Sequence, residues 1–97
     1  MALDDIEDTP GGARLSMRLH LPNGLHARPA ARLAQTAQRY RSSIRIIAET
    51  GEADVKSMLD VLSLALADQT PFTIEATGTD AHEAIGAVAG FLEGLAG

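Results

Sequence analysis

The chain has 97 residues, which is the size of one compact domain. It contains no cysteine, so disulfides, thiolate metal sites and thiol nucleophiles are excluded. The net charge of −5 argues against non-specific nucleic-acid binding, and no apolar run approaches the roughly 20 residues of a membrane span. The acidic start has neither the basic nor the apolar region of a signal peptide, so we expect a cytoplasmic protein.

The first residues differ in composition from the rest of the chain. Four acidic side chains among the first eight residues account for most of the net charge, and Pro10-Gly11-Gly12 follows them. The segment shows no hydrophobic periodicity. We therefore expect residues 1–13 to be a flexible acidic tail and residues 14–97 to form the domain.

A strand and a helix are expected at the start of this domain. Residues 14–21 alternate strictly between apolar and polar side chains, which predicts a half-buried strand. The Pro-Asn-Gly sequence of residues 22–24 predicts a turn. Residues 27–40 then carry Pro29 in the first turn of a predicted helix, where its missing N–H is tolerated. The apolar stripe of this helix is formed by Ala30, Leu33, Ala34 and Ala37.

Two more short strands are expected next. Residues 43–49 predict a strand whose inward side chains are Ile44 and Ile46. After a turn at Thr50-Gly51, residues 53–55 predict a third strand.

The last part of the chain predicts a helix, a strand and a final helix. Ser57, with Asp60 three positions later, resembles a capping box at the start of a helix that runs to about residue 66. Residues 71–77 alternate again, and Asp80 is expected to cap the last helix. The inward residues of these two elements are predicted to be Phe72, Ile74, Ala76, Ile85, Val88, Leu92 and Leu95.

The element order βαββαβα predicts an α+β fold. Four short strands with segregated helices favour an open-faced β-sandwich, with a four-stranded antiparallel sheet and three helices on one face. Periodicity gives the list of elements but not the order of strands in the sheet.

His26 lies between the predicted turn and the first helix. A neutral imidazole is a nucleophile near pH 7, and the N–H groups of Ala27 and Arg28 at a helix N-terminus would attract a phosphoryl dianion. Arg28 adds a guanidinium whose planar fork matches phosphate oxygens. Taken alone, a histidine beside a helix start is also compatible with a simple polar cap.

Two motifs of the chain stand 31 residues apart, counted from His26 to Ser57. The first reads Gly24-Leu25-His26-Ala27-Arg28-Pro29-Ala30, and the second reads Lys56-Ser57-Met58-Leu59-Asp60-Val61-Leu62-Ser63-Leu64. Together they resemble the active-site motif and the second signature of the HPr family, the histidine-containing phosphocarrier proteins of the phosphoenolpyruvate-dependent sugar phosphotransferase system. The resemblance runs from about residue 14 to the C-terminal end and includes the element order.

The resemblance implies a phosphoryl carrier rather than an enzyme. His26 would accept a phosphoryl group on Nδ1 from phospho-enzyme I and pass it to a sugar-specific component of the phosphotransferase system. Arg28 would steady the phosphoryl group in both transfers. No cofactor, metal site, nucleic acid or membrane insertion is implied, and a monomer is expected.

The same resemblance gives Ser57 two possible roles. It is similar to the regulatory serine that HPr kinase phosphorylates in some bacterial lineages. The residues themselves indicate only a helix N-cap, and both interpretations stay open.

The helix that follows is apolar nearly all round. Val61, Leu64 and Ala65 are expected to meet the sheet, which would leave three apolar side chains exposed near His26: Met58, Leu59 and Leu62. Exposed apolar patches commonly mark docking sites, and HPr-like proteins bind enzyme I and their acceptors at these positions. Complete burial in the core is the alternative.

Several residues depart from the family pattern. Asp60 and Gln69 stand where the family often has glycine, and a non-glycine residue at 69 is expected to strain its turn. With the acidic tail, these differences leave open a paralogous carrier in a nitrogen-related or dihydroxyacetone-kinase phosphorelay, or a docking module that transfers no phosphate. His20 and His82 are predicted to be surface residues outside the site. The sequence does not name the sugar or the acceptor.

Overall fold

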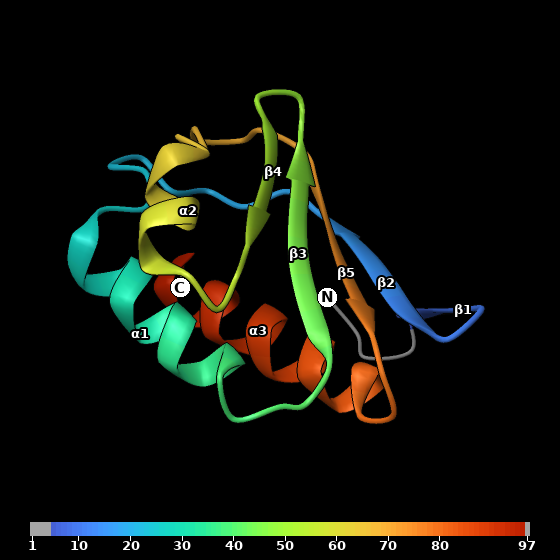
Figure 1. Ribbon diagram of the computed structural model, residues 1–97. Coiled ribbons are helices and arrows are strands. Elements are labelled where there is room, and N and C mark those ends of the chain that lie inside the picture. Colours follow the sequence, from blue (N-terminus) through green and yellow to red (C-terminus); the bar gives the residue numbers. More distant parts are fainter. Residues whose placement is uncertain (1–4, 97) are drawn as a thin grey trace.

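The computed structural model describes residues 5–96 (Figure 1). Its elements in chain order are β1 (Glu7–Thr9), β2 (Gly12–Met17), α1 (Ala27–Ala37), β3 (Ser43–Ala48), β4 (Gly51–Asp54), α2 (Met58–Ser63), β5 (Phe72–Thr77) and α3 (Ala81–Ala96).

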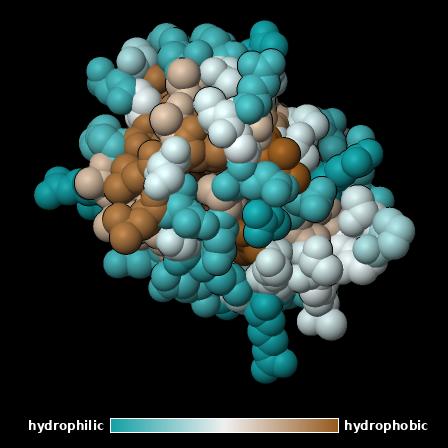
Figure 2. Space-filling model, turned by 45° about the horizontal axis from the view of Figure 1, so that its top comes forward, coloured by the Kyte–Doolittle hydropathy of each residue, from teal (hydrophilic) through white to brown (hydrophobic). Residues whose placement is uncertain are grey.

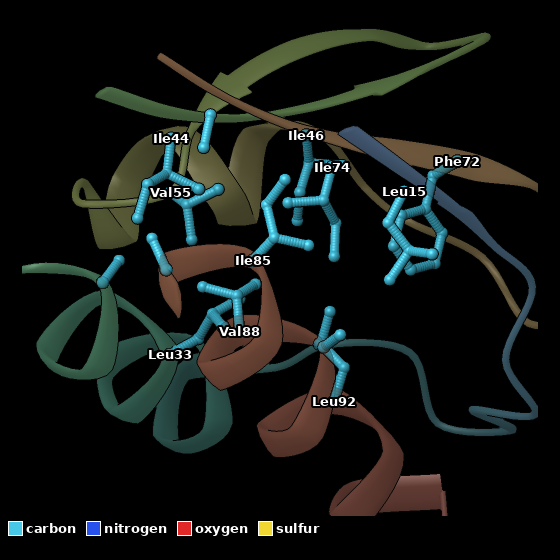
Figure 3. Packing of buried hydrophobic residues seen from close by; sticks show 14 of the residues in the cluster. Leu15, Leu33, Ile44, Ile46, Val55, Phe72, Ile74, Ile85, Val88 and Leu92 are labelled. Carbon is cyan, nitrogen blue, oxygen red and sulfur yellow. The ribbon is translucent and has the colours of Figure 1, made fainter. Parts of the chain in front are cut away.

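One antiparallel sheet carries all the described strands, in the order β1-β2-β5-β3-β4. The last strand of the chain, β5, therefore lies between β2 and β3, an order that the periodicity did not reveal. The three helices lie on one face of the sheet, and the other face is open (Figures 1 and 3). The predicted α+β open-faced sandwich is confirmed.

The core lies between the sheet and the helices. Alternate side chains of the strands point inward because successive residues face opposite sides of a strand. Figure 3 shows these side chains meeting the apolar stripes of α1 and α3. The largest side chains that are fully buried there include Leu15, Leu33, Ile44, Ile46, Ile74, Ile85 and Leu92. The inward positions predicted for the first helix and for the strands are confirmed, and Leu95 alone of those predicted for the last helix is exposed.

The sheet has five strands instead of the four that were predicted. The additional strand, β1, falls within the segment expected to be a flexible tail and pairs with the start of β2. Pro10 and Gly11 form a tight hairpin turn, with Gly11 at φ +79°, and Ile6 is buried against the core. Ile6 is the single apolar residue between positions 4 and 9, which is too little for a period, so this strand could not be recognised. Residues 1–4 of the predicted tail lie outside the described residues.

Several predicted elements are longer than those observed, and α1 ends at Ala37 rather than near residue 40. β2 ends at Met17, four residues before the end of the alternating pattern. α2 ends at Ser63 rather than near residue 66, and Ala65 is exposed with φ +51° instead of packing on the sheet. Residues 64–67 are all apolar, so the sequence did not indicate that the helix ends at Ser63.

Asp80 precedes α3 as expected, but its carboxylate bonds to a different part of the chain. It accepts hydrogen bonds from the backbone N–H groups of Arg41 and Ser42, each at 2.9 Å, and from the Ser42 hydroxyl. The Ser42 hydroxyl first, and then the Arg41 N–H, lower the pKa of Asp80 from 3.8 to about 2. The carboxylate therefore ties the loop between α1 and β3 to the start of α3.

None of the helices within residues 5–96 combines the length and the apolar character that crossing a membrane would need.

Candidate functional site

A tight turn, here called the site turn, spans residues 21–24 and precedes α1. The N–H of Gly24 donates to the carbonyl of Leu21 at 2.8 Å, which closes the turn predicted from the Pro-Asn-Gly sequence. Gly24 has φ +66°, a region that glycine adopts without steric cost. A Cβ at this position would also lie 3.6 Å from the carbonyl oxygen of Leu66, so the turn rests close to the segment after α2.

His26 is the N-cap residue of α1, as predicted. Its backbone is extended, with φ −89° and ψ −176°, and its carbonyl accepts the Ala30 N–H at 3.0 Å. The imidazole is exposed and makes no capping hydrogen bond to the helix. The simple cap interpretation therefore does not describe this ring, whose nitrogens remain available.

The start of α1 forms a small site for an anion. Pro29 has no N–H, and the N–H of Ala30 is already bonded to His26, so the N–H groups of Ala27 and Arg28 are the ones left without helical partners. The first turn of α1 contains no acidic side chain. These N–H groups and the helix dipole make the potential beside the His26 ring positive.

The Arg28 side chain and a shallow hollow complete the surroundings of the His26 ring. The Arg28 side chain is exposed, and no ion pair engages it within the part of the chain that the structure describes. A shallow hollow of about 130 Å³ lies beside His26, lined by residues 21–24, Pro29 and Leu95 of α3. The site is thus open and shallow, which suits chemistry completed by a partner at a surface.

The apolar side chains of α2 differ in their exposure. Met58 and Leu59 are exposed, at 36% and 70%, whereas Leu62 is half-buried and packs against the core. The expectation that all three are left exposed is therefore correct for the first two and wrong for Leu62, which the short helix turns toward the core. Figure 2 shows hydrophobic side chains gathered where Figure 1 places α2.

Ser57 caps α2, as predicted. Its hydroxyl accepts the N–H of Asp60 at 3.2 Å. The Asp60 carboxylate in turn accepts the N–H of Asp54 at 3.2 Å, which connects α2 to the end of β4. Asp60 therefore has a structural contact of its own.

Two residues near the site were not anticipated from the sequence. Leu95 reaches the hollow from the end of α3, and Asp68 contacts the chain just before the site turn. Both are distant from His26 in sequence, so no local pattern could have indicated them. His20 and His82 are exposed, as expected, and His20 lies beside Asp68.

Comparison with known sequences assigns most of the chain to one family. Residues 14–94 match the family model described as the phosphorylation site of the phosphotransferase-system HPr component. The phosphocarrier protein HPr of Mycoplasma capricolum is 45% identical over 65 residues, which cover 67% of this chain and 73% of the relative. HPr of Buchnera aphidicola is 38% identical over 79 residues, covering 81% and 93%.

Solved structures lead to the same family. The histidine-containing phosphocarrier protein of a mycoplasma superposes with a TM-score of 0.81 at 37% identity, covering 86% of this chain and 94% of that structure. HPr of Bacillus anthracis gives a TM-score of 0.75 at 35% identity, with coverage of 81% and 94%. Fold and sequence thus define a phosphocarrier protein. The chain belongs to the HPr family of the phosphotransferase system.

Proposed function

We propose that this protein accepts a phosphoryl group on Nδ1 of His26 from phospho-enzyme I and passes it to a sugar-specific component of the phosphotransferase system. The observation that carries the proposal is the exposed imidazole at the N-terminus of α1. The other part of the proposal, that the donor is enzyme I charged by phosphoenolpyruvate, comes from the family.

The part that we propose for the chain is the same in each transfer. The neutral imidazole of His26 attacks phosphorus, the new N–P bond forms, and the bond to the donor breaks. The N–H groups of Ala27 and Arg28, with the Arg28 guanidinium, then stabilise the dianion at the helix N-terminus. Attack on the phosphohistidine by the acceptor reverses these steps. Catalysis of this kind depends mainly on positioning and charge, which two docked proteins supply together.

Docking is assigned to α2. The exposed Met58 and Leu59, with the accessible edge of Leu62, form an apolar surface that we propose binds enzyme I and the acceptor. We expect the protein to work in the cytoplasm as a monomer. Among the structural neighbours, Crh of Bacillus subtilis is described as a dimer, and sedimentation of this chain distinguishes the two states.

Ser57 remains a candidate for phosphorylation by HPr kinase. A phosphate there would add about −1.5 to −2 charge at the first turn of α2, beside the docking residues. The hydroxyl is already bonded to the Asp60 N–H and the side chain is half-buried. Incubation with HPr kinase and ATP, with Ser57→Ala as the control, decides between regulation and capping alone.

Mass spectrometry after incubation with phosphoenolpyruvate and purified enzyme I tests the main proposal. We expect one acid-labile phosphate on the wild-type protein and none on His26→Ala. His82→Ala removes another exposed histidine and is expected to be labelled like the wild type. Labelling that persists in His26→Ala would refute the site.

The labelled protein also separates the alternative functions. Transfer of its phosphate to a sugar-specific component supports transport. Transfer only to a component of a nitrogen-related or dihydroxyacetone-kinase relay would support a paralogous carrier. Partner binding without any turnover on His26 would support a docking module.

A further inference from the structure

We infer that Asp68 is a positioning residue for phosphoryl transfer. It fixes the turn that precedes His26 and so holds His26 in place at the start of α1. This inference rests on the proposed function. Asp68 belongs to the connection between α2 and β5, 42 residues beyond His26 in the sequence.

One carboxylate oxygen makes two contacts with the chain before the site. Oδ1 of Asp68 accepts a hydrogen bond from the backbone N–H of Leu21, and it lies 3.1 Å from Nδ1 of His20. Leu21 is buried, and this carboxylate is the hydrogen-bond partner that the structure gives its N–H. Hydrogen bonds from a backbone N–H to a charged acceptor are stronger than those between neutral groups.

Leu21 is connected to His26 by the site turn. Leu21 supplies the carbonyl that accepts the Gly24 N–H and closes the site turn. That turn lines the hollow beside the imidazole, and His26 follows two residues after Gly24. Fixing the N–H of Leu21 therefore fixes the residue at which the turn begins.

The connection that carries Asp68 is itself held against the same segment, which joins β2 to the site turn. The N–H of Gln69 donates to the carbonyl of Leu19 at 2.9 Å, and its side-chain amide lies 3.3 Å from Nδ1 of His20. Gln69 has φ +62°, the left-handed conformation that a side chain rarely adopts. Such backbone strain persists only where neighbouring contacts determine the conformation, and here they surround Asp68.

A positioning role has a distinct kinetic consequence. The Asp68 carboxylate contacts Leu21 and His20 rather than the docking side chains of α2, so loss of these contacts should leave partner affinity largely unchanged. The His26 ring would instead sample positions away from the attacking geometry. A shift of about 1 Å can lower a rate by up to about 100-fold.

Two variants of Asp68 test the assignment. In Asp68→Ala both contacts are lost, and we expect the kcat for transfer from phospho-enzyme I to fall by roughly tenfold or more, with KM within about twofold. In Asp68→Asn the amide oxygen still accepts the Leu21 N–H, so we expect most of the rate to return. Hydrogen exchange of the Leu21 amide should accelerate in the alanine variant and stay slow in the asparagine variant.

Asp80→Ala is the matched control. Asp80 also accepts backbone N–H groups from a distant loop, but that loop is the one between α1 and β3. This variant should lose stability while keeping kcat. A wild-type kcat in Asp68→Ala, or an equal fall in Asp80→Ala, would overturn the assignment, and so would unchanged exchange at Leu21. If the wild type itself takes up no phosphate, the proposed function fails and the assignment with it.

Discussion

Arg28 combines two contributions at the second position of α1. Its backbone N–H belongs to the free helix N-terminus, and its exposed guanidinium carries a planar pair of donors. Substitution changes only the second contribution. We therefore expect Arg28→Ala to lower the rate of phosphoryl transfer to His26 by on the order of 10²-fold, as the loss of one stabilising donor does elsewhere.

A lysine at position 28 separates the contribution of the positive charge from that of the planar guanidinium. Arg28→Lys keeps the positive charge but loses the fork, so an intermediate rate is expected in single-turnover transfer from phospho-enzyme I. Arg32→Ala removes an exposed guanidinium one turn further along the same helix and should have little effect. Equal rates for Arg28→Ala and Arg32→Ala would contradict the role given to Arg28.

For single residues, the sequence predicts which neighbours in the chain lie together but not which distant residues are in contact. His26 and Arg28 are close in the chain and share the start of one helix, so helix geometry alone brings them together. Asp68 lies 47 residues from its partner Leu21, and their contact depends on how β2 and β5 pair. Strand order was not available from periodicity, so this contact could not be inferred.

The cap of α2 belongs to the scale of a single element. α2 has six residues, which is too short to be stable without its cap and its packing. Because the Ser57 hydroxyl satisfies the Asp60 N–H, we expect Ser57→Ala to lower the free energy of unfolding by about 1 kcal/mol, measured by urea denaturation.

A second serine of α2 provides the comparison for this loss. Ser63 donates to the Leu59 carbonyl and is exposed, and serine bonds of that kind do not favour a helix. Ser63→Ala should therefore change stability little. Equal destabilisation by the two substitutions would show that the hydroxyl of Ser57 has no particular role as a cap.

The exposed face of α2 gives a prediction about binding. Leu59 is 70% exposed, so replacing it should cost the fold little while removing apolar contact from the proposed docking surface. We expect Leu59→Ser to weaken binding to enzyme I by roughly tenfold in calorimetry, consistent with the loss of one interface side chain. Ile47→Ser changes a half-buried residue on the opposite face of the sheet and should leave the affinity unchanged.

The elements show where periodicity succeeds and where it fails. Regular alternation marked β2, β3 and β5 because each has one buried and one open face. α2 has apolar side chains nearly all round, so nothing in its composition marks the end at Ser63. β1 has three residues and depends on the turn after it, so it carries too few positions to show a period.

At the scale of the whole molecule, two carboxylates hold loops to elements distant in sequence. Asp68 holds the chain ahead of α1, and Asp80 holds the loop that follows it. Asp68 therefore acts at the end of α1 where His26 lies, and Asp80 at the opposite end, away from the site. The position of His26 thus depends on the completed fold as well as on its own motif.

Asp80 makes the stability of the fold sensitive to acid. Its pKa is lowered from 3.8 to about 2, mainly by the Ser42 hydroxyl, so the native state favours the ionised form. The resulting stabilisation is fully present above about pH 4. It is lost progressively as the pH falls through the folded pKa of about 2. We expect the difference in free energy of unfolding between the wild type and Asp80→Asn to be largest above pH 4 and to shrink toward pH 2.

Ser42→Ala distinguishes this mechanism from general acid denaturation. The substitution removes the largest cause of the lowered pKa, while the backbone N–H groups of Arg41 and Ser42 remain as donors to Asp80. The pKa of Asp80 should therefore move back toward its ordinary value, and its share of the stability should be lost at a higher pH than in the wild type. Urea midpoints measured across this pH range give the comparison. A difference between the wild type and Asp80→Asn that stays constant with pH would mean that the carboxylate is bonded no more strongly in the folded chain than in the unfolded one.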